Sequence, residues 1–219
     1  QEDTVNAWLV RRLMANIDSL LLTFPGAHWL TVGDGRYGND AYYINQSGGD
    51  ALASDISVDL LEQALEMGRI KEFSEENAEA LSFVDESFDF VLCKESFHHF
   101  PRPWIALYEM LRVAREAVIL IEPNDLLTLN SPQAIVYRKL KDWFYQWVLR
   151  RELTDHEYEE VGNYVFTISQ REMIKVALGL NYPAVAFRTF NTHYISGVES
   201  EKFADRGPFH SSGLKILSH

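Results

Sequence analysis

The sequence is poor in cysteine, in basic residues and in long apolar runs, and each shortage excludes a class of protein. Its 219 residues include one cysteine, Cys93, so the chain cannot form a disulfide with itself, and a cytoplasmic location is expected. Twenty Lys and Arg oppose 32 Asp and Glu, for a net charge of -12. A nucleic-acid partner would require a basic face, and a membrane span would require roughly 20 apolar residues. We therefore expect no nucleic-acid partner and no membrane partner.

Short apolar strands alternate with amphipathic helices along most of the chain. Candidate strands lie at residues 28–34, 51–56, 70–73, 88–93 and 117–121, with helical segments between them. This alternation predicts an α/β fold in which helices cover both faces of a parallel sheet. Two more candidate strands, at residues 184–190 and 213–217, bring the prediction to a doubly wound, mostly parallel, seven-stranded sheet of Rossmann-like type.

The pattern divides into four parts that form one domain, residues 1–219. An N-terminal helix occupies residues 1–25, and the core sheet occupies residues 28–125. A helical cover, inserted after the fifth strand, is expected at residues 131–168 because Ser131 and Pro132 are a typical helix start. A C-terminal helix and strands follow at residues 169–219, where Ser169 and Glu172 form a capping box. Ser57 is expected to cap the helix that follows the second strand.

A glycine-rich turn, Gly33-Asp34-Gly35-Arg36-Tyr37-Gly38, follows the first candidate strand. Glycine allows a tight turn and the close approach of a ligand to the backbone. Asp55 ends the second strand, where a carboxylate can accept hydrogen bonds from the two hydroxyls of a ribose. The turn also matches the G-x-G-x-x-G pattern of dinucleotide sites. An NAD(P)-dependent oxidoreductase is therefore an alternative interpretation, and a purely structural turn is another.

The middle of the chain narrows these alternatives. Residues 77–91 begin Asn-Ala-Glu and end in a Ser-Phe-Asp-Phe-Val strand start, and residues 92–100 carry a His-His pair. Residues 106–113 contain a Glu-x-x-Arg-Val helix, and residues 119–123 read Ile-Leu-Ile-Glu-Pro. In this order and spacing, residues 28–125 resemble class I methyltransferases, closest to those related to the ubiquinone and menaquinone C-methylating enzymes. The resemblance implies a methyltransferase with S-adenosylmethionine as cofactor.

The resemblance also implies roles at the methionine end of the cofactor. Gly33, Asp34 and Gly35 would pass under the methionine part. Lys94 and Glu95, at the end of the fourth strand, would lie near its amino-acid group.

A second set of residues would hold the nucleoside. The resemblance implies that Asp55 holds the ribose and that Ile56 lies beside the adenine. Asn77 would face the adenine amino group, and the Ala78 amide would face a ring nitrogen, in a segment that Glu79 completes. Asn77 stands where Asp is commoner, although its amide oxygen is still an acceptor.

Two departures from the family pattern fall in the glycine turn. Thr31 stands where the family usually has an acidic residue, two positions before Gly33. Tyr37 stands where the third glycine is usual, with Gly38 one position later. Both bear on how the methionine end is bound.

His98 and His99 are the candidate catalytic residues. They lie just beyond the fourth strand, on the expected acceptor side, and an imidazole is the natural base near neutral pH. The alternative is a structural role in the turn. Adjacent side chains diverge, and no carboxylate–histidine set accompanies the pair, so no metal site is expected.

The acceptor is expected to bind against the segments outside the resemblance. The candidate residues are Tyr137, Trp143, Asn163 and Tyr164; packing in the core or in a homodimer interface is the alternative for the aromatic ones. A small molecule or a sugar of a glycan is the expected acceptor, with O-methylation as the expected reaction. A non-catalytic adenosyl-binding or interaction module is the remaining alternative.

Overall fold

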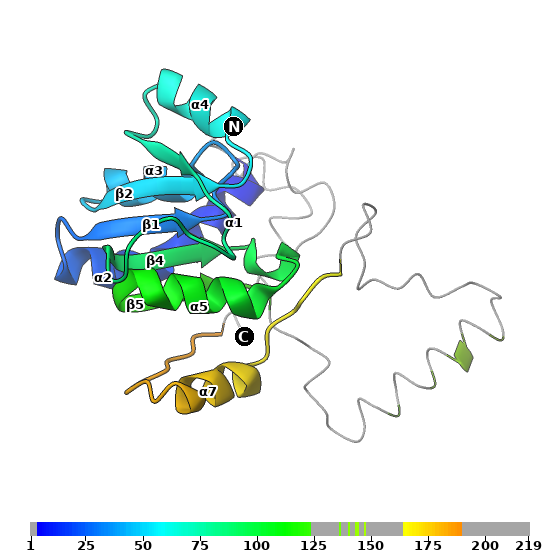
Figure 1. The fold of residues 1–219 in the computed structure, drawn as a ribbon. Coiled ribbons are helices and arrows are strands. Elements are labelled where there is room, and N and C mark those ends of the chain that lie inside the picture. The colour runs from blue at the N-terminus through cyan, green and yellow to red at the C-terminus, as the bar shows by residue number, and fades with distance from the viewer. Residues whose placement is uncertain are drawn as a thin grey trace.

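Five parallel strands form one sheet in the computed structural model, which describes residues 4–123 and 164–189 together with Val136, Leu140, Trp143, Phe144 and Trp147. The strands are β1 (His28–Val32), β2 (Asp50–Asp55), β3 (Phe73–Glu75), β4 (Phe88–Lys94) and β5 (Ala114–Ile121). Their order in the sheet is β3-β2-β1-β4-β5, and every neighbouring pair is parallel (Figure 1). The predicted Rossmann-like α/β architecture is therefore confirmed. Of the two further strands in the seven-strand prediction, residues 213–217 lie outside the described residues.

Helices cover both faces of this sheet. On one face lie the helices α1 (Val5–Met14), η1 (Ala15–Ile17), α2 (Asp18–Thr23), α3 (Asn39–Gln46) and α4 (Asp59–Glu66). On the other face lie η2 (Phe97–His99), α5 (Pro103–Val113) and α7 (Gln170–Gly179). Figure 1 shows α7 next to α5, and Met173 and Val176 of α7 pack against the buried cluster beneath α5. In the part of the chain that the structure describes, no helix has the length and apolar character needed to cross a membrane.

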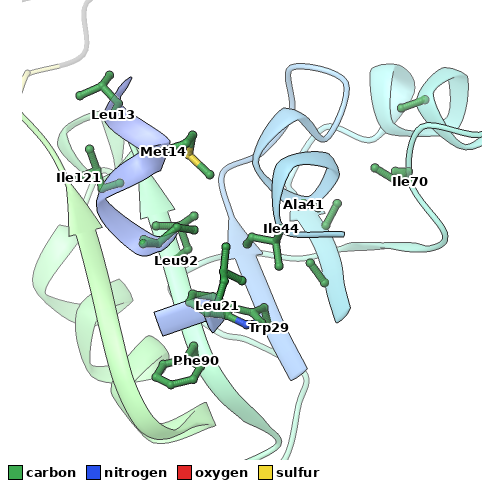
Figure 2. Packing of buried hydrophobic residues seen from close by; sticks show 14 of the residues in the cluster. Leu13, Met14, Leu21, Trp29, Ala41, Ile44, Ile70, Phe90, Leu92 and Ile121 are labelled. Carbon is green, nitrogen blue, oxygen red and sulfur yellow. The ribbon is translucent and has the colours of Figure 1, made fainter. Parts of the chain in front are cut away.

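The strands send alternate side chains into two separate cores, as the period of two requires. Trp29 and Phe90, on β1 and β4, face α1 to α4, and their rings stack with centroids 4.6 Å apart. Figure 2 shows both rings beneath Leu21 of α2. Leu30 and Val91, one position along, are buried in the core on the α5 side. Because both faces are buried, the strands are almost continuously apolar.

Several predicted boundaries are corrected by the structure. The third strand was expected at residues 70–73, but β3 spans Phe73–Glu75, because Ile70 is instead a buried residue packed against Gly38. Ser57 does not cap α4: the cap is Val58, and the Ser57 amide donates to the Asp55 carboxylate. Residues 184–189, predicted as a strand, have no regular secondary structure. A strand requires a hydrogen-bonded neighbour, and no strand is paired with them among the described residues.

Outside the sheet, the predicted N-terminal helix is present as α1, η1 and α2. The capping box of α7 is also confirmed, with Ser169 Oγ accepting from the Glu172 amide at 3.2 Å. The helical cover at residues 131–168 lies mostly outside the described residues. The five residues described within residues 124–163 are all helical.

The strand order reverses between β1 and β4. From β1 the chain continues outward through β2 and β3, and then returns to place β4 on the other side of β1. Ligands of open α/β sheets bind at such a switch point, beside the carboxyl ends of the strands. The residues after β1, β2, β4 and β5 therefore define the candidate site.

Candidate cofactor and acceptor site

The glycine turn after β1 is shaped by its neighbours at this sheet edge. Gly33 has φ +78°, and its amide and that of Asp34 both donate to the Ser54 carbonyl, each at 3.0 Å. A Cβ at Gly35 would lie 2.7 Å from Asp55 Oδ2, closer than a real Cβ contact permits. Glycine at these positions lets the turn lie directly against the end of β2.

Asp55 is fixed by two backbone amides. Its Oδ2 accepts from the Gly35 amide and its Oδ1 from the Ser57 amide, each at 2.9 Å. A carboxylate has about four lone-pair sites, so acceptor capacity remains on this partly exposed side chain. Ile56 beside it is 69% exposed, which leaves an apolar surface adjoining the carboxylate. A ribose on Asp55 and an adenine on Ile56 fit this arrangement.

The segment after β3 is organised by a buried acid that sequence reasoning missed. Glu76 is buried, and its carboxylate accepts from the Ser82 amide at 2.9 Å and from the Ser82 hydroxyl at 2.6 Å. It thereby closes the loop that presents Asn77 and Ala78. Asn77 is exposed, and its Oδ1 accepts from the Glu79 amide at 3.0 Å. Asn77 and Ala78 are thus placed beyond the β3 end, as the resemblance implies.

Glu79 has a different partner. Its carboxylate accepts from the Arg102 amide at 2.7 Å and from Arg102 Nε at 2.6 Å. The Glu79 side chain, a candidate for the adenine-binding segment, is therefore hydrogen-bonded to the residue that precedes α5.

Asp34 directs its carboxyl group inward, away from solvent. The group is buried and accepts from the Asp40 amide at 3.2 Å and the Ala41 amide at 2.9 Å, in the first turn of α3. The Thr31 hydroxyl donates to it at 3.0 Å. Burial, together with the nearby Asp40 carboxylate, raises the pKa of Asp34 to about 8. Thr31, which replaces the usual family acid, thus binds the carboxyl group of the residue between the first two glycines.

A buried ion pair lies next to the same turn. Asp40 Oδ1 is 3.4 Å from Lys94 Nζ, and it lacks a hydrogen-bond partner among the described residues. Burial raises the pKa of Asp40 in spite of Lys94. Burial works to lower the pKa of Lys94, but the carboxylates of Asp40 and Glu95 raise it. Opposite charges with unfilled hydrogen-bonding capacity suit the ammonium and carboxylate groups of an amino acid.

The ends of β4 and β5 are joined by Glu122. Its side chain is 2% exposed, and its Oε1 accepts from the Ser96 and Phe97 amides, each at 2.9 Å. Its Oε2 pairs with His98 Nδ1. The Ser96 hydroxyl in turn donates to the Gly33 carbonyl at 2.7 Å. One buried carboxylate thus connects the candidate base with the glycine turn.

The two candidate histidines differ in their surroundings. His98 is buried and paired with Glu122, whereas His99 is exposed, with the two ring centroids 4.0 Å apart. The His98 carbonyl accepts from the Phe166 amide at 2.9 Å. Phe166 also contacts the Tyr164 ring, with centroids 4.8 Å apart. The structure therefore brings the candidate acceptor residue Tyr164 close to η2.

Among the other candidate acceptor residues, Trp143 is the one that the structure describes. Trp143 is exposed and stacks on Trp147, with centroids 5.9 Å apart. Tyr137 and Asn163 lie outside the described residues. Across the described ranges 4–123 and 164–189, no three His, Cys, Asp or Glu side chains are grouped to hold a metal ion.

Four residues of the site were not assigned a role from the sequence: Asp40, Glu76, Ser96 and Glu122. Glu122 had a usable signal, because it is a carboxylate directly after the most apolar strand, as Asp55 is after β2. Asp40 resembles any acidic residue in a first helical turn, so its sequence position gave no signal.

Comparisons with known proteins agree with this geometry. Residues 30–121 match the family model of a methyltransferase domain. Among solved structures, a SAM-dependent methyltransferase from Methanosarcina mazei has 23% identity and a TM-score of 0.58, covering 80% of this chain and 88% of that chain. Magnesium protoporphyrin IX methyltransferase from Synechocystis PCC 6803, with bound SAH, has 17% identity and a TM-score of 0.59, with coverages of 84% and 78%. The YcgJ protein from Bacillus subtilis has 18% identity and a TM-score of 0.58, with coverages of 95% and 83%.

No curated protein matches the sequence. The similar structures establish a shared fold, and the family match adds the activity. The match of residues 30–121 to the methyltransferase domain, together with the shared fold, supports an S-adenosylmethionine-dependent methyltransferase. The comparisons give no support to the oxidoreductase alternative or to a non-catalytic module.

Proposed function

We propose that this enzyme transfers the methyl group of S-adenosylmethionine to a hydroxyl oxygen of a small-molecule or glycan-type acceptor. The observation that carries the proposal is the buried pair of His98 and Glu122 beside the switch point. A hydroxyl group is a weak nucleophile until its proton is removed, and a positioned imidazole can remove it near neutral pH.

The cofactor end of the proposal uses the residues after β1, β2 and β3. Asp55 would accept hydrogen bonds from the ribose hydroxyls with the lone pairs that its two amide partners leave. Ile56, Asn77 and the Ala78 amide would surround the adenine. When bound, the cofactor supplies an electrophilic methyl group on a sulfonium.

The methionine end would lie over the glycine turn, near Lys94 and Glu95. The Asp40 oxygen without a hydrogen-bond partner and the Lys94 ammonium offer one charge of each sign there. We propose that Asp40 and Lys94 hold the amino-acid group of the cofactor. They would take the role of the acidic residue that the family usually has at the position of Thr31. The role of these residues is orientation, since methyl transfer depends on holding donor and acceptor in line.

The acceptor would bind beside η2, within reach of His98. Tyr164 supports this placement because its neighbour Phe166 is hydrogen-bonded to the His98 carbonyl. Tyr137, Trp143 and Asn163 complete the proposed acceptor surface. A cover over this edge would exclude water from the reacting groups.

Two measurements test the proposal. Isothermal titration should detect binding of S-adenosylhomocysteine and none of NADH. Purified protein given methyl-labelled S-adenosylmethionine and separate pools of phenols, sugars, amines and activated-methylene compounds should label the hydroxyl pools. Binding of NADH in place of S-adenosylhomocysteine would contradict the cofactor. Labelling confined to amines or carbon acids would contradict O-methylation.

A further inference from the structure

We infer that Glu122 is a positioning residue: it holds His98 in the tautomer of a general base and ties that base to the glycine turn. The inference rests on the proposed function for the base role of His98. The positions of Glu122 and Ser96 follow from the structure alone.

The first step concerns the imidazole. The Glu122 carboxylate is almost fully buried, and a buried charge is stable only when it is well hydrogen-bonded. Two backbone amides and His98 Nδ1 supply those bonds. Because a carboxylate only accepts, Nδ1 must carry the proton, so the lone pair of the neutral ring lies on Nε2.

The second step concerns Nε2. The His98 side chain is 11% exposed, and the hydrogen bond described for its ring is at Nδ1. The backbone of His98 is held from the other side by the Phe166 amide, so the ring is fixed at both its Nδ1 and its main chain. A base fixed in this way can present Nε2 to an acceptor hydroxyl.

The third step connects this base to the cofactor turn. The oxygen of Glu122 that accepts from the Phe97 amide also accepts from the Ser96 amide. Ser96 then donates its hydroxyl to the Gly33 carbonyl, and a Cβ at Gly33 would lie 2.4 Å from Ser96 Cβ. Gly33 and His98 are thus positioned by a single carboxylate, although they lie on turns after different strands.

In the reaction, the acceptor O–H bond breaks and its proton moves to Nε2 of His98. The oxygen lone pair forms the new O–CH₃ bond while the S–CH₃ bond breaks and its electron pair stays on sulfur. The imidazolium that forms is stabilised by Glu122 and later releases its proton to solvent. No further reactant is required.

Two side chains contact the imidazole of His98. Glu122 pairs with Nδ1, and the centroid of the His99 ring lies 4.0 Å from that of His98. Among the described residues, Glu122 is the one carboxylate that is paired with this imidazole.

The test compares Glu122→Gln with Glu116→Gln, an exposed carboxylate on β5, the strand that Glu122 follows. The Gln oxygen can still accept from the Ser96 and Phe97 amides, but its NH₂ group would face Nδ1 and favour the opposite tautomer. We expect kcat to fall about 100-fold or more, while the Kd for S-adenosylhomocysteine should change less than about threefold. Glu116→Gln should match the wild type in both.

Long-range ¹H–¹⁵N spectra of the histidine rings give a readout that does not depend on activity. The wild type should show His98 as the Nδ1–H tautomer, and Glu122→Gln should lose that signature. Ser96→Ala should do the converse: it should weaken S-adenosylhomocysteine binding several-fold and leave the His98 ring signals unchanged.

Unchanged ring spectra and an unchanged kcat in folded Glu122→Gln would overturn the inference. Failure of the proposed function has a different appearance. Wild-type protein would then methylate no hydroxyl acceptor, while the His98 ring signals would still respond to Glu122→Gln.

Discussion

The ends of β2 and β5 make an instructive pair, because each strand is followed by a carboxylate that accepts from two backbone amides. Asp55 accepts from Gly35 and Ser57, and Glu122 accepts from Ser96 and Phe97. In both cases one carboxylate fixes the turn after the neighbouring strand. The sequence signal, an acid directly after an apolar strand, is the same.

The two carboxylates differ in what covers them. Asp55 is partly exposed and adjoins the exposed Ile56, so its remaining lone pairs face outward. Glu122 is covered by His98, so its charge acts on another side chain of the protein. The same local motif therefore leaves a partly exposed carboxylate at one strand end and a buried carboxylate paired within the protein at the other. The difference arises because the turn after β4 contributes His98, which pairs with Glu122.

The largest effect is expected on kcat, from a substitution of His98, the partner of the carboxylate that follows β5. Asn in its place keeps an N–H near the position of Nδ1 for Glu122 but has no Nε2. We expect His98→Asn to lower kcat by about 10²–10⁴-fold, the usual range for loss of a general base, with S-adenosylhomocysteine affinity retained. Stopped-time assays with labelled methyl donor measure this.

His99→Asn is the matched control for that variant, since His99 is the exposed neighbour. Its rate should stay within about tenfold of the wild type, because its side chain is exposed and Glu122 pairs with His98 instead. A greater loss in His99→Asn than in His98→Asn would assign the base to His99.

Removal of Asp55, the carboxylate at the end of β2, should weaken ligand binding and should not act through the methyl-transfer rate. Asp55→Ala removes charge-assisted hydrogen bonds that are typically worth about 1.5–3 kcal/mol, so S-adenosylhomocysteine should bind roughly 10- to 150-fold more weakly. Isothermal titration measures the change, with Asp59→Ala, an exposed acid in the first turn of α4, as the control. Equal affinity in the two variants would remove Asp55 from the site.

The pH dependence of stability tests the protonation of Asp34, which lies in the glycine turn. Its folded-state pKa of about 8 lies above the ordinary 3.8, so the folded state binds this proton more tightly than the unfolded state. The group contributes stability below pH 4 that is lost as pH rises toward 8. The free energy of unfolding should fall by up to about 1.4 kcal/mol per pH unit in this window from this group alone.

Asp34→Asn, measured by urea unfolding between pH 5 and 8, should remove that contribution. The variant is compared with the wild type at each pH so that the titration of all other groups cancels in the difference. Carboxyls with lowered pKa, such as Asp50 and Glu109, change stability only below this window. A difference between the two proteins that is constant with pH would show that Asp34 is ionised throughout.

The fold was predictable where the signal is local. Continuous apolar runs located β1, β2, β4 and β5, because strands buried on both faces need them. The third strand was misplaced, since Ile70 is apolar in order to pack under the glycine turn and β3 pairs over only three residues.

The candidate site was predictable only in part, for the same reason. Asp55 could be assigned because its position at a strand end is visible in the sequence. The roles of Asp40 and Glu122 depend on Lys94 and His98, which are contributed by a different strand end. The sequence also did not reveal that the Asp34 carboxyl would lie against Thr31 and the first turn of α3.

The smallest effect should come from a third carboxylate, Glu79, which sharpens the contrast between Asp55 and Glu122. Its side chain accepts from the main chain and guanidinium of Arg102, whose own side chain is 67% exposed. The Glu79 side chain is itself only 7% exposed, and Gln keeps an oxygen that can accept from the Arg102 amide. Glu79→Gln should therefore leave S-adenosylhomocysteine affinity within about threefold of the wild type and lower stability. Titration and thermal unfolding of the same samples measure both. A loss of affinity as large as that of Asp55→Ala would mean that Glu79 leaves Arg102 to contact the cofactor. The position of an acidic residue after a strand would then predict ligand contact better than its hydrogen-bond partners in the protein alone.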